Sequence, residues 1–160
     1  FTIYLPFGPV GVTLGSFLVY LTGFLLGVKW SCISVFLYLC IGVAGIPVFS
    51  GYTAGAGVLF GPTGGFLLGY IPCGALVGLF SEKSIAGKKG LPGFLLGMIS
   101  GTVVLYLTGT LWFLFVYGGA SSPGEAIAAC VLPFLPADMV KIIFAVLLYR
   151  PFVRLKRCML

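Results

Sequence analysis

The chain has 160 residues, of which 60% are hydrophobic and only 8% are charged, and it contains no histidine. Because a soluble domain carries about 25% charged residues, this composition excludes an ordinary soluble protein and indicates an integral membrane protein. With no histidine and only three carboxylate side chains, the sequence offers no general acid–base pair and no metal cluster. We therefore expect neither an enzyme nor a bound metal nor a resident cofactor.

Five apolar runs follow one another along the chain, and each is near the ~20 residues with which a helix crosses a bilayer. They cover residues 12–28, 31–46, 63–81, 91–117 and 134–149. The runs are apolar on all sides, whereas the strands of a membrane barrel alternate between apolar and polar residues. The sequence thus predicts an all-α fold, a polytopic helix bundle in which residues 1–160 form a single transmembrane domain.

Basic residues lie between alternate runs and predict an orientation. Eight of the nine lysine and arginine residues are Lys29, those in the connection 83–89 and those after residue 149. The connections 47–62 and 118–133 contain none. The positive-inside rule assigns the basic side, and with it the C-terminus, to the cytoplasm of a prokaryotic cell membrane. Contact with lipid headgroups accounts for the net charge of +6, so we expect no nucleic-acid partner.

Five spans and a cytoplasmic C-terminus place Phe1 outside the membrane. The opening segment "FTIYLPFGPVG" contains two prolines and is typical of an external loop. We therefore expect a sixth, N-terminal span upstream of Phe1, and a genuine external N-terminus is the alternative.

Glycines recur at four-residue spacing in two of the runs. Such spacing places small residues on one helix face, where neighbouring backbones can approach closely in lipid. The predicted helix-packing positions are Gly61, Gly65, Gly69, Gly93, Gly97 and Gly101.

The uncharged external connection 47–62 is long and rich in glycine. Loops of this length are usually functional or disordered, and its apolar residues argue against free solvation. We expect a lid over an external cavity, in which Gly51, Gly55 and Phe60 shape the loop and Ser50, Tyr52 and Thr53 face the substrate.

Asp138 and Lys141 lie three residues apart in the last apolar run, and at helical spacing they share a face. Each such charge costs ~2.5–3.5 kcal/mol at mid-membrane, so the pair needs a reason. The prolines before it predict that regular helix begins near residue 135, below the outer surface. A polar cavity under the lid fits these features. A helix-start role for Asp138 and a structural ion pair remain alternatives.

An acceptor and a cationic donor within apolar walls suit a small amphipathic molecule that has N–H donors and a carboxylate or carbonyl. At this point a family resemblance becomes visible. The segments "GVAGIPVFSG", "GPTGGFLLGY" and "LPFLPADMVK" resemble the BioY family, the substrate-specificity components of energy-coupling factor (ECF) transporters for biotin.

The resemblance implies six helices and biotin contacts from Asp138 and Lys141. It also implies a lid at 47–62, and a partner module of two ATPases with a membrane coupling protein. The family often shows TLQT where this chain has Thr13-Leu14-Gly15-Ser16, so a glutamine is absent here. A component for a different vitamin and a non-transport membrane scaffold remain the other hypotheses.

Overall fold

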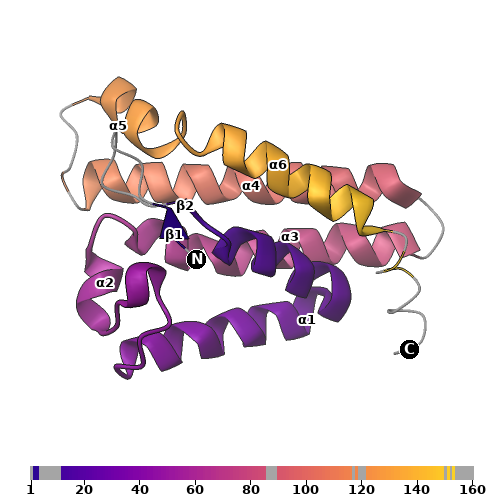
Figure 1. Ribbon diagram of the computed structural model, residues 1–160, viewed down its shortest axis with the longest axis horizontal. Coiled ribbons are helices and arrows are strands. Elements are labelled where there is room, and N and C mark those ends of the chain that lie inside the picture. The colour runs from indigo at the N-terminus through magenta and orange to yellow at the C-terminus, as the bar shows by residue number, and fades with distance from the viewer. Residues whose placement is uncertain are drawn as a thin grey trace.

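The computed structural model describes residues 2–3, 12–85, 90–116, 118, 122–149, 151 and 153. These residues form long helices that lie side by side, with shorter elements at one end (Figure 1). The elements are β1 (Thr2–Ile3), β2 (Val12–Thr13), α1 (Gly15–Val43), the 3-10 helix η1 (Ser50–Tyr52), α2 (Ala56–Phe60), α3 (Gly64–Ile85), α4 (Gly90–Phe115), α5 (Pro123–Cys130) and α6 (Leu135–Leu147).

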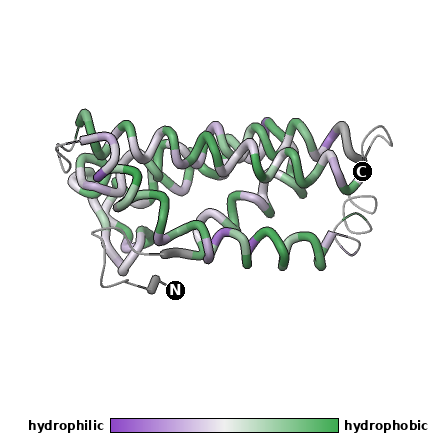
Figure 2. The backbone as a smooth tube through the Cα atoms, turned by 90° about the horizontal axis from the view of Figure 1, so that it is seen from above, coloured by the Kyte–Doolittle hydropathy of each residue, from purple (hydrophilic) through white to green (hydrophobic). Residues whose placement is uncertain are grey.

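The helical architecture agrees with the predicted fold class, with one small correction. Val12–Thr13, placed in the first helical run from sequence, pairs antiparallel with Thr2–Ile3. In Figure 2, hydrophobic residues extend along the length of the helices and hydrophilic ones occupy short patches. The described helices α3 and α4 are each long and apolar enough to cross a membrane, and α1 is also long and apolar enough but is broken in the middle.

The first two predicted runs, 12–28 and 31–46, both fall largely within α1, which is broken in the middle. Gly27 has φ 78° and ψ −175°, a conformation that glycine adopts without the penalty of a Cβ atom. The chain reverses direction there, so α1 consists of two arms that lie side by side (Figure 1). The Glu82 side chain of α3 accepts a hydrogen bond from the Val28 amide at 3.2 Å and thereby caps the second arm.

Glycines bring α3 into close contact with α4, the most extensive contact between described elements. A Cβ atom built at Gly65 would lie 2.2 Å from Trp112 Cβ, and one at Gly97 would lie 2.8 Å from Phe80 Cβ. Gly69 and Gly101 face the opposite helix in the same way. These four predicted packing positions therefore lie at the helix–helix contact, and Gly93 is buried.

The prediction for Gly61 is wrong in its placement. Because α3 begins only at Gly64, Gly61 lies at the C-terminal end of α2 and not on the α3 face. Its carbonyl instead accepts a hydrogen bond from Trp112 Nε1 at 3.1 Å.

The connection 47–62 folds against the end of α1 and contains η1 and α2. The Tyr38 hydroxyl donates to the Val48 carbonyl at 3.1 Å, and the Gly55 amide donates to the Gly42 carbonyl at 2.8 Å. Phe49 is only 4% exposed, and its ring lies over Gly42, where a Cβ would be 2.1 Å from it. The segment is thus attached to α1 at several points.

The last two helices cross the bundle on its other side. Ser122 caps α5 by accepting from the Glu125 amide, and α6 begins at Leu135 with Pro136 in its first turn. The predicted start of regular helix near residue 135 is confirmed. The helix reaches the bundle mainly through α1 and α4.

Candidate functional site

A cavity of about 390 Å³ lies between α1, α3, α4, α6 and the 47–62 segment. Pockets of ~300–1,000 Å³ with mostly apolar walls and a few polar groups are typical small-molecule sites. Most of its lining is apolar or aromatic, and its polar residues are Ser16, Thr22, Ser34, Tyr38, Ser50, Thr63, Tyr70, Tyr106, Asp138 and Lys141.

The charged pair of α6 forms one side of this cavity. Lys141 Nζ lies 2.7 Å from Asp138 Oδ1, and the two residues are 8% and 5% exposed. Lys141 also donates to Ser16 Oγ at 2.8 Å, and Tyr106 donates to Asp138 Oδ2 at 2.5 Å. Three helices, α1, α4 and α6, therefore meet at one connected group of polar side chains.

The local sequence explains this geometry. Asp138 and Lys141 are one helical turn apart, so their side chains meet on the same face of α6. Ser16 lies in the first turn of α1, close to where that helix enters the bundle. Because buried charges are costly unless they are paired and hydrogen-bonded, the two hydroxyls stabilise the charged forms on either side.

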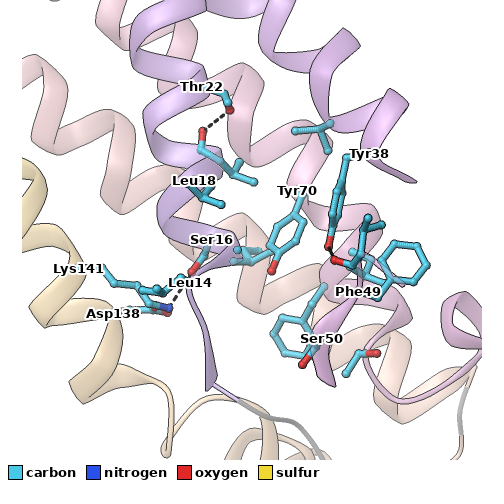
Figure 3. A pocket seen from close by; sticks show the side chains of 18 of the residues that line it. Leu14, Ser16, Leu18, Thr22, Tyr38, Phe49, Ser50, Tyr70, Asp138 and Lys141 are labelled. Carbon is cyan, nitrogen blue, oxygen red and sulfur yellow. Dashed lines mark hydrogen bonds and ion pairs between the residues drawn. The ribbon is translucent and has the colours of Figure 1, made fainter. Parts of the chain in front are cut away.

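The opposite side of the cavity is aromatic. Tyr38 and Phe49 meet edge to face with ring centroids 5.6 Å apart. In Figure 3, Ser16, Asp138 and Lys141 gather on one side of the pocket, Tyr38 and Phe49 lie on the other, and Tyr70 stands between them. The cavity thus offers a charged end and an aromatic end to a single ligand.

The predicted lid residues are divided by the structure. Ser50 lines the cavity, whereas Tyr52 and Thr53 do not, and Tyr52 is 88% exposed. The Thr53 hydroxyl donates to the Ser50 carbonyl at 2.9 Å, so it shapes the turn. The structure therefore does not bring Tyr52 and Thr53 together with Asp138 and Lys141.

The residues proposed to shape the lid also lie outside the cavity lining. Gly51 and Gly55 have φ of 70° and 95°, where glycine is favoured, and Phe60 is 70% exposed. In the described part of the chain, the two glycines allow the turns by which the backbone passes from α1 to α3.

Sequence reasoning missed Ser16, Tyr106 and Tyr70 as members of the site. The departure from the family pattern at Gly15-Ser16 pointed to the right place but was read only as a missing glutamine. A tyrosine in the middle of the apolar run of α4 was a usable signal, because a buried phenol usually finds a hydrogen-bond partner.

The arrangement is suited to binding a ligand that carries polar groups. It combines one carboxylate, one ammonium and several hydroxyl groups, and the part of the chain that the structure describes holds no cluster of three metal-ligating side chains. Such a set recognises polar groups by hydrogen bonds and charge.

Comparison with known proteins identifies the family. The model of the BioY family matches residues 1–157 of this chain. This chain belongs to the BioY family. It is 34% identical to the biotin transporter BioY of Thermotoga maritima over 146 residues, which are 91% of this chain and 82% of that protein. It is 38% identical to biotin transporter BioY2 of Lactococcus lactis over 89% of this chain and 74% of that protein.

A solved member of this type has the same fold. The crystal structure at 2.1 Å of the S-component for biotin from an ECF-type ABC transporter superposes with a TM-score of 0.82 and 28% identity, over 98% of this chain and 80% of that one. The likeness places the described helices of this BioY family chain in the S-component fold.

Proposed function

We propose that this chain captures biotin at the outer side of a prokaryotic cytoplasmic membrane, as the substrate-binding component of an ECF-type transporter. The observation that carries the proposal is the cavity with one charged side and apolar walls in a chain of the BioY family. The function of the relatives, biotin transport, agrees with it.

Biotin matches the chemistry of the cavity. Its ureido ring has two N–H donors and one carbonyl, its thiophane ring and valeryl chain are apolar, and its tail ends in a carboxylate. We propose that Asp138 accepts from a ureido N–H and that Lys141 donates to a carbonyl or carboxylate oxygen of biotin. The Asp138 oxygens already accept from Lys141 and Tyr106, yet a carboxylate has about four acceptor sites and can take a further donor.

The proposed partner is the ECF energising module, which the family resemblance describes as two ATPases and a transmembrane coupling protein. In the membrane, the two arms of α1, α3, α4 and the α5–α6 segment would form five crossings in contact with lipid. The 47–62 segment, attached to α1 and lying over the cavity, would act as the lid on the external side.

One feature supports this orientation. The hydrogen bond from Val28 to Glu82 holds the reversal of α1 beside the end of α3, and Lys29 lies at that same end. Most of the remaining basic residues lie outside the described residues, including those of the 86–89 connection and of the C-terminal segment after 153. Their predicted cytoplasmic location stays a proposal.

Thiol labelling tests the orientation in a background with the five native cysteines replaced by alanine. A membrane-impermeant reagent added from outside should label Tyr52→Cys and should not label Lys29→Cys. The reverse pattern would overturn the orientation without touching the fold.

Calorimetric titration of the purified chain with biotin tests the function. We expect saturable one-to-one binding that desthiobiotin competes with and unrelated vitamins do not. Binding of another vitamin in preference would indicate a different substrate. The chain would be a membrane scaffold if it bound no vitamin and if its function in the cell survived the double change Asp138→Leu and Lys141→Met.

A further inference from the structure

The two oxygens of Asp138 are held by different helices. Lys141, from the same helix, occupies Oδ1, and the Tyr106 hydroxyl of α4 occupies Oδ2. The carboxylate of an aspartate can rotate about the Cβ–Cγ bond. Hydrogen bonds from two donors that lie in different directions fix the plane of the carboxylate. Hydrogen bonds to an ionised acceptor are roughly twice as strong as neutral ones, so the Tyr106 contact is strong enough to do this.

Tyr106 is also placed to combine this contact with the ligand site. It lines the cavity and is only partly buried, and its hydroxyl contacts Asp138, which lines the cavity as well. On the same helix, one turn earlier, Thr102 accepts or donates at 2.7 Å to Tyr20, a fully buried tyrosine that does not line the cavity. Two tyrosine hydroxyls thus contact polar groups in one region, and only that of Tyr106 reaches the carboxylate.

We propose that Tyr106 is a positioning residue and that its hydroxyl fixes the orientation of the Asp138 carboxylate toward the ligand. The inference rests on the proposed function for its ligand, biotin, and on the hydrogen bond alone for its geometry. Without the hydroxyl, Asp138 keeps its charge and its partner Lys141 but loses its fixed plane. The number of ligand orientations that the pair can satisfy then rises, and affinity falls.

The sequence allows a direct measurement, because Asp138 is the sole aspartate in the chain. Protein made by cell-free synthesis with carboxyl-¹³C aspartate therefore has one labelled side-chain carboxylate, visible by infrared spectroscopy. In the ligand-free protein, Tyr106→Phe should shift the labelled carboxylate band, since the band position depends on hydrogen bonding to each oxygen. The control Tyr20→Phe likewise removes a hydrogen-bonded tyrosine hydroxyl, one that does not contact Asp138, and should leave the band in place.

Titration with biotin supplies the second measurement. Tyr106→Phe should weaken binding by about threefold to tenfold, which is the loss expected when the ligand must immobilise a side chain that the hydroxyl no longer holds. Tyr20→Phe should bind as the parent does, because Thr102 keeps its bond to the Met98 carbonyl and the cavity lining is unchanged. In an Asp138→Asn background, the effect of Tyr106→Phe should largely disappear, because a residue that acts through another is coupled to it.

These outcomes separate the inference from the proposed function. If the parent fails to bind biotin, the proposed function is wrong, while a band shift in Tyr106→Phe still supports the fixed carboxylate. An unmoved band, or biotin affinity equal to that of Tyr20→Phe, would overturn the positioning role. Equal losses in the parent and Asp138→Asn backgrounds would overturn it as well, since Tyr106 would then contact the ligand independently.

Discussion

The contact between α3 and α4 and the contact of α6 with its neighbours are built on different physical principles. Glycines let the backbones of α3 and α4 approach closely, so shape complementarity stabilises that pair. In contrast, α6 reaches α1 and α4 through Ser16, Tyr106, Asp138 and Lys141, a set of polar bonds.

The difference separates support from recognition. In lipid, van der Waals packing of small residues stabilises helix pairs without any polar group, and such a contact carries no ligand chemistry. The buried hydrogen bonds and ion pair of α6 give little net stability, yet their polar groups are available to bind a ligand. Under the proposed function, the first region therefore stabilises the scaffold, and the second supplies the affinity for the ligand.

The largest effect should come from removing the charged pair. Either Asp138→Ala or Lys141→Ala leaves the other charge buried without its partner, which costs ~2–5 kcal/mol at a binding site. Biotin affinity measured by calorimetry should fall by at least about tenfold in each variant. Binding within about twofold of the parent in both variants would make the pair purely structural.

The double change Asp138→Leu and Lys141→Met sharpens the comparison. Replacing a buried ion pair by apolar residues of similar volume is often neutral for stability. We expect thermal unfolding in detergent to remain near that of the parent while biotin binding is lost. A collapse of the fold would show that the polar contacts of α6 also support the scaffold.

The converse experiment disturbs the glycine contact. Gly65→Ala puts a Cβ atom 2.2 Å from Trp112 Cβ, and overpacking of this kind costs ~1–3 kcal/mol. The melting temperature in detergent should fall, while the molecules that remain folded should bind biotin with unchanged affinity. Gly57→Ala is the matched control, because no atom lies within 4 Å of its Cβ position, and it should melt as the parent does.

The smallest expected effect belongs to Ser16. In Ser16→Ala, Lys141 loses one hydrogen bond within the protein but keeps its ion pair with Asp138, so affinity should fall by only a few-fold. Ser16→Thr keeps the hydroxyl and should retain most of the affinity in the same titration. If Ser16→Ala binds as tightly as Ser16→Thr, the serine only fills space.

The regular parts of the molecule could be predicted from sequence because they depend on local pattern. The apolar runs gave α3, α4 and α6 nearly at their observed bounds, and the prolines before Asp138 indicated the start of α6. Four-residue spacing also found the glycines at the α3–α4 contact. The prediction that Gly61 lies on the same helix face was wrong, because the spacing of glycines does not show where a helix begins.

In the candidate site, sequence could predict only those residues whose burial in a membrane costs much free energy. Asp138 and Lys141 stood out because charge in an apolar run is expensive. Tyr106 and Ser16 are ordinary residues for a membrane helix, and only the tertiary arrangement brings them to the pair. Tyr52 and Thr53 were chosen for their polarity in the 47–62 segment, yet polarity there does not fix which side chains turn inward.

The hydrogen bond between Lys141 and Ser16 joins residues 125 positions apart. Domains form as the chain emerges during synthesis. Contacts between residues far apart in sequence form last, because the entropy cost of closing the loop precedes the favourable energy of the contact. During synthesis, the arms of α1 and the α3–α4 pair can assemble while α6 is still absent. The cavity then lacks Asp138 and Lys141, so under the proposed function the nascent protein would hold a scaffold that cannot yet bind biotin. Completion of α6 would be the step at which binding is acquired.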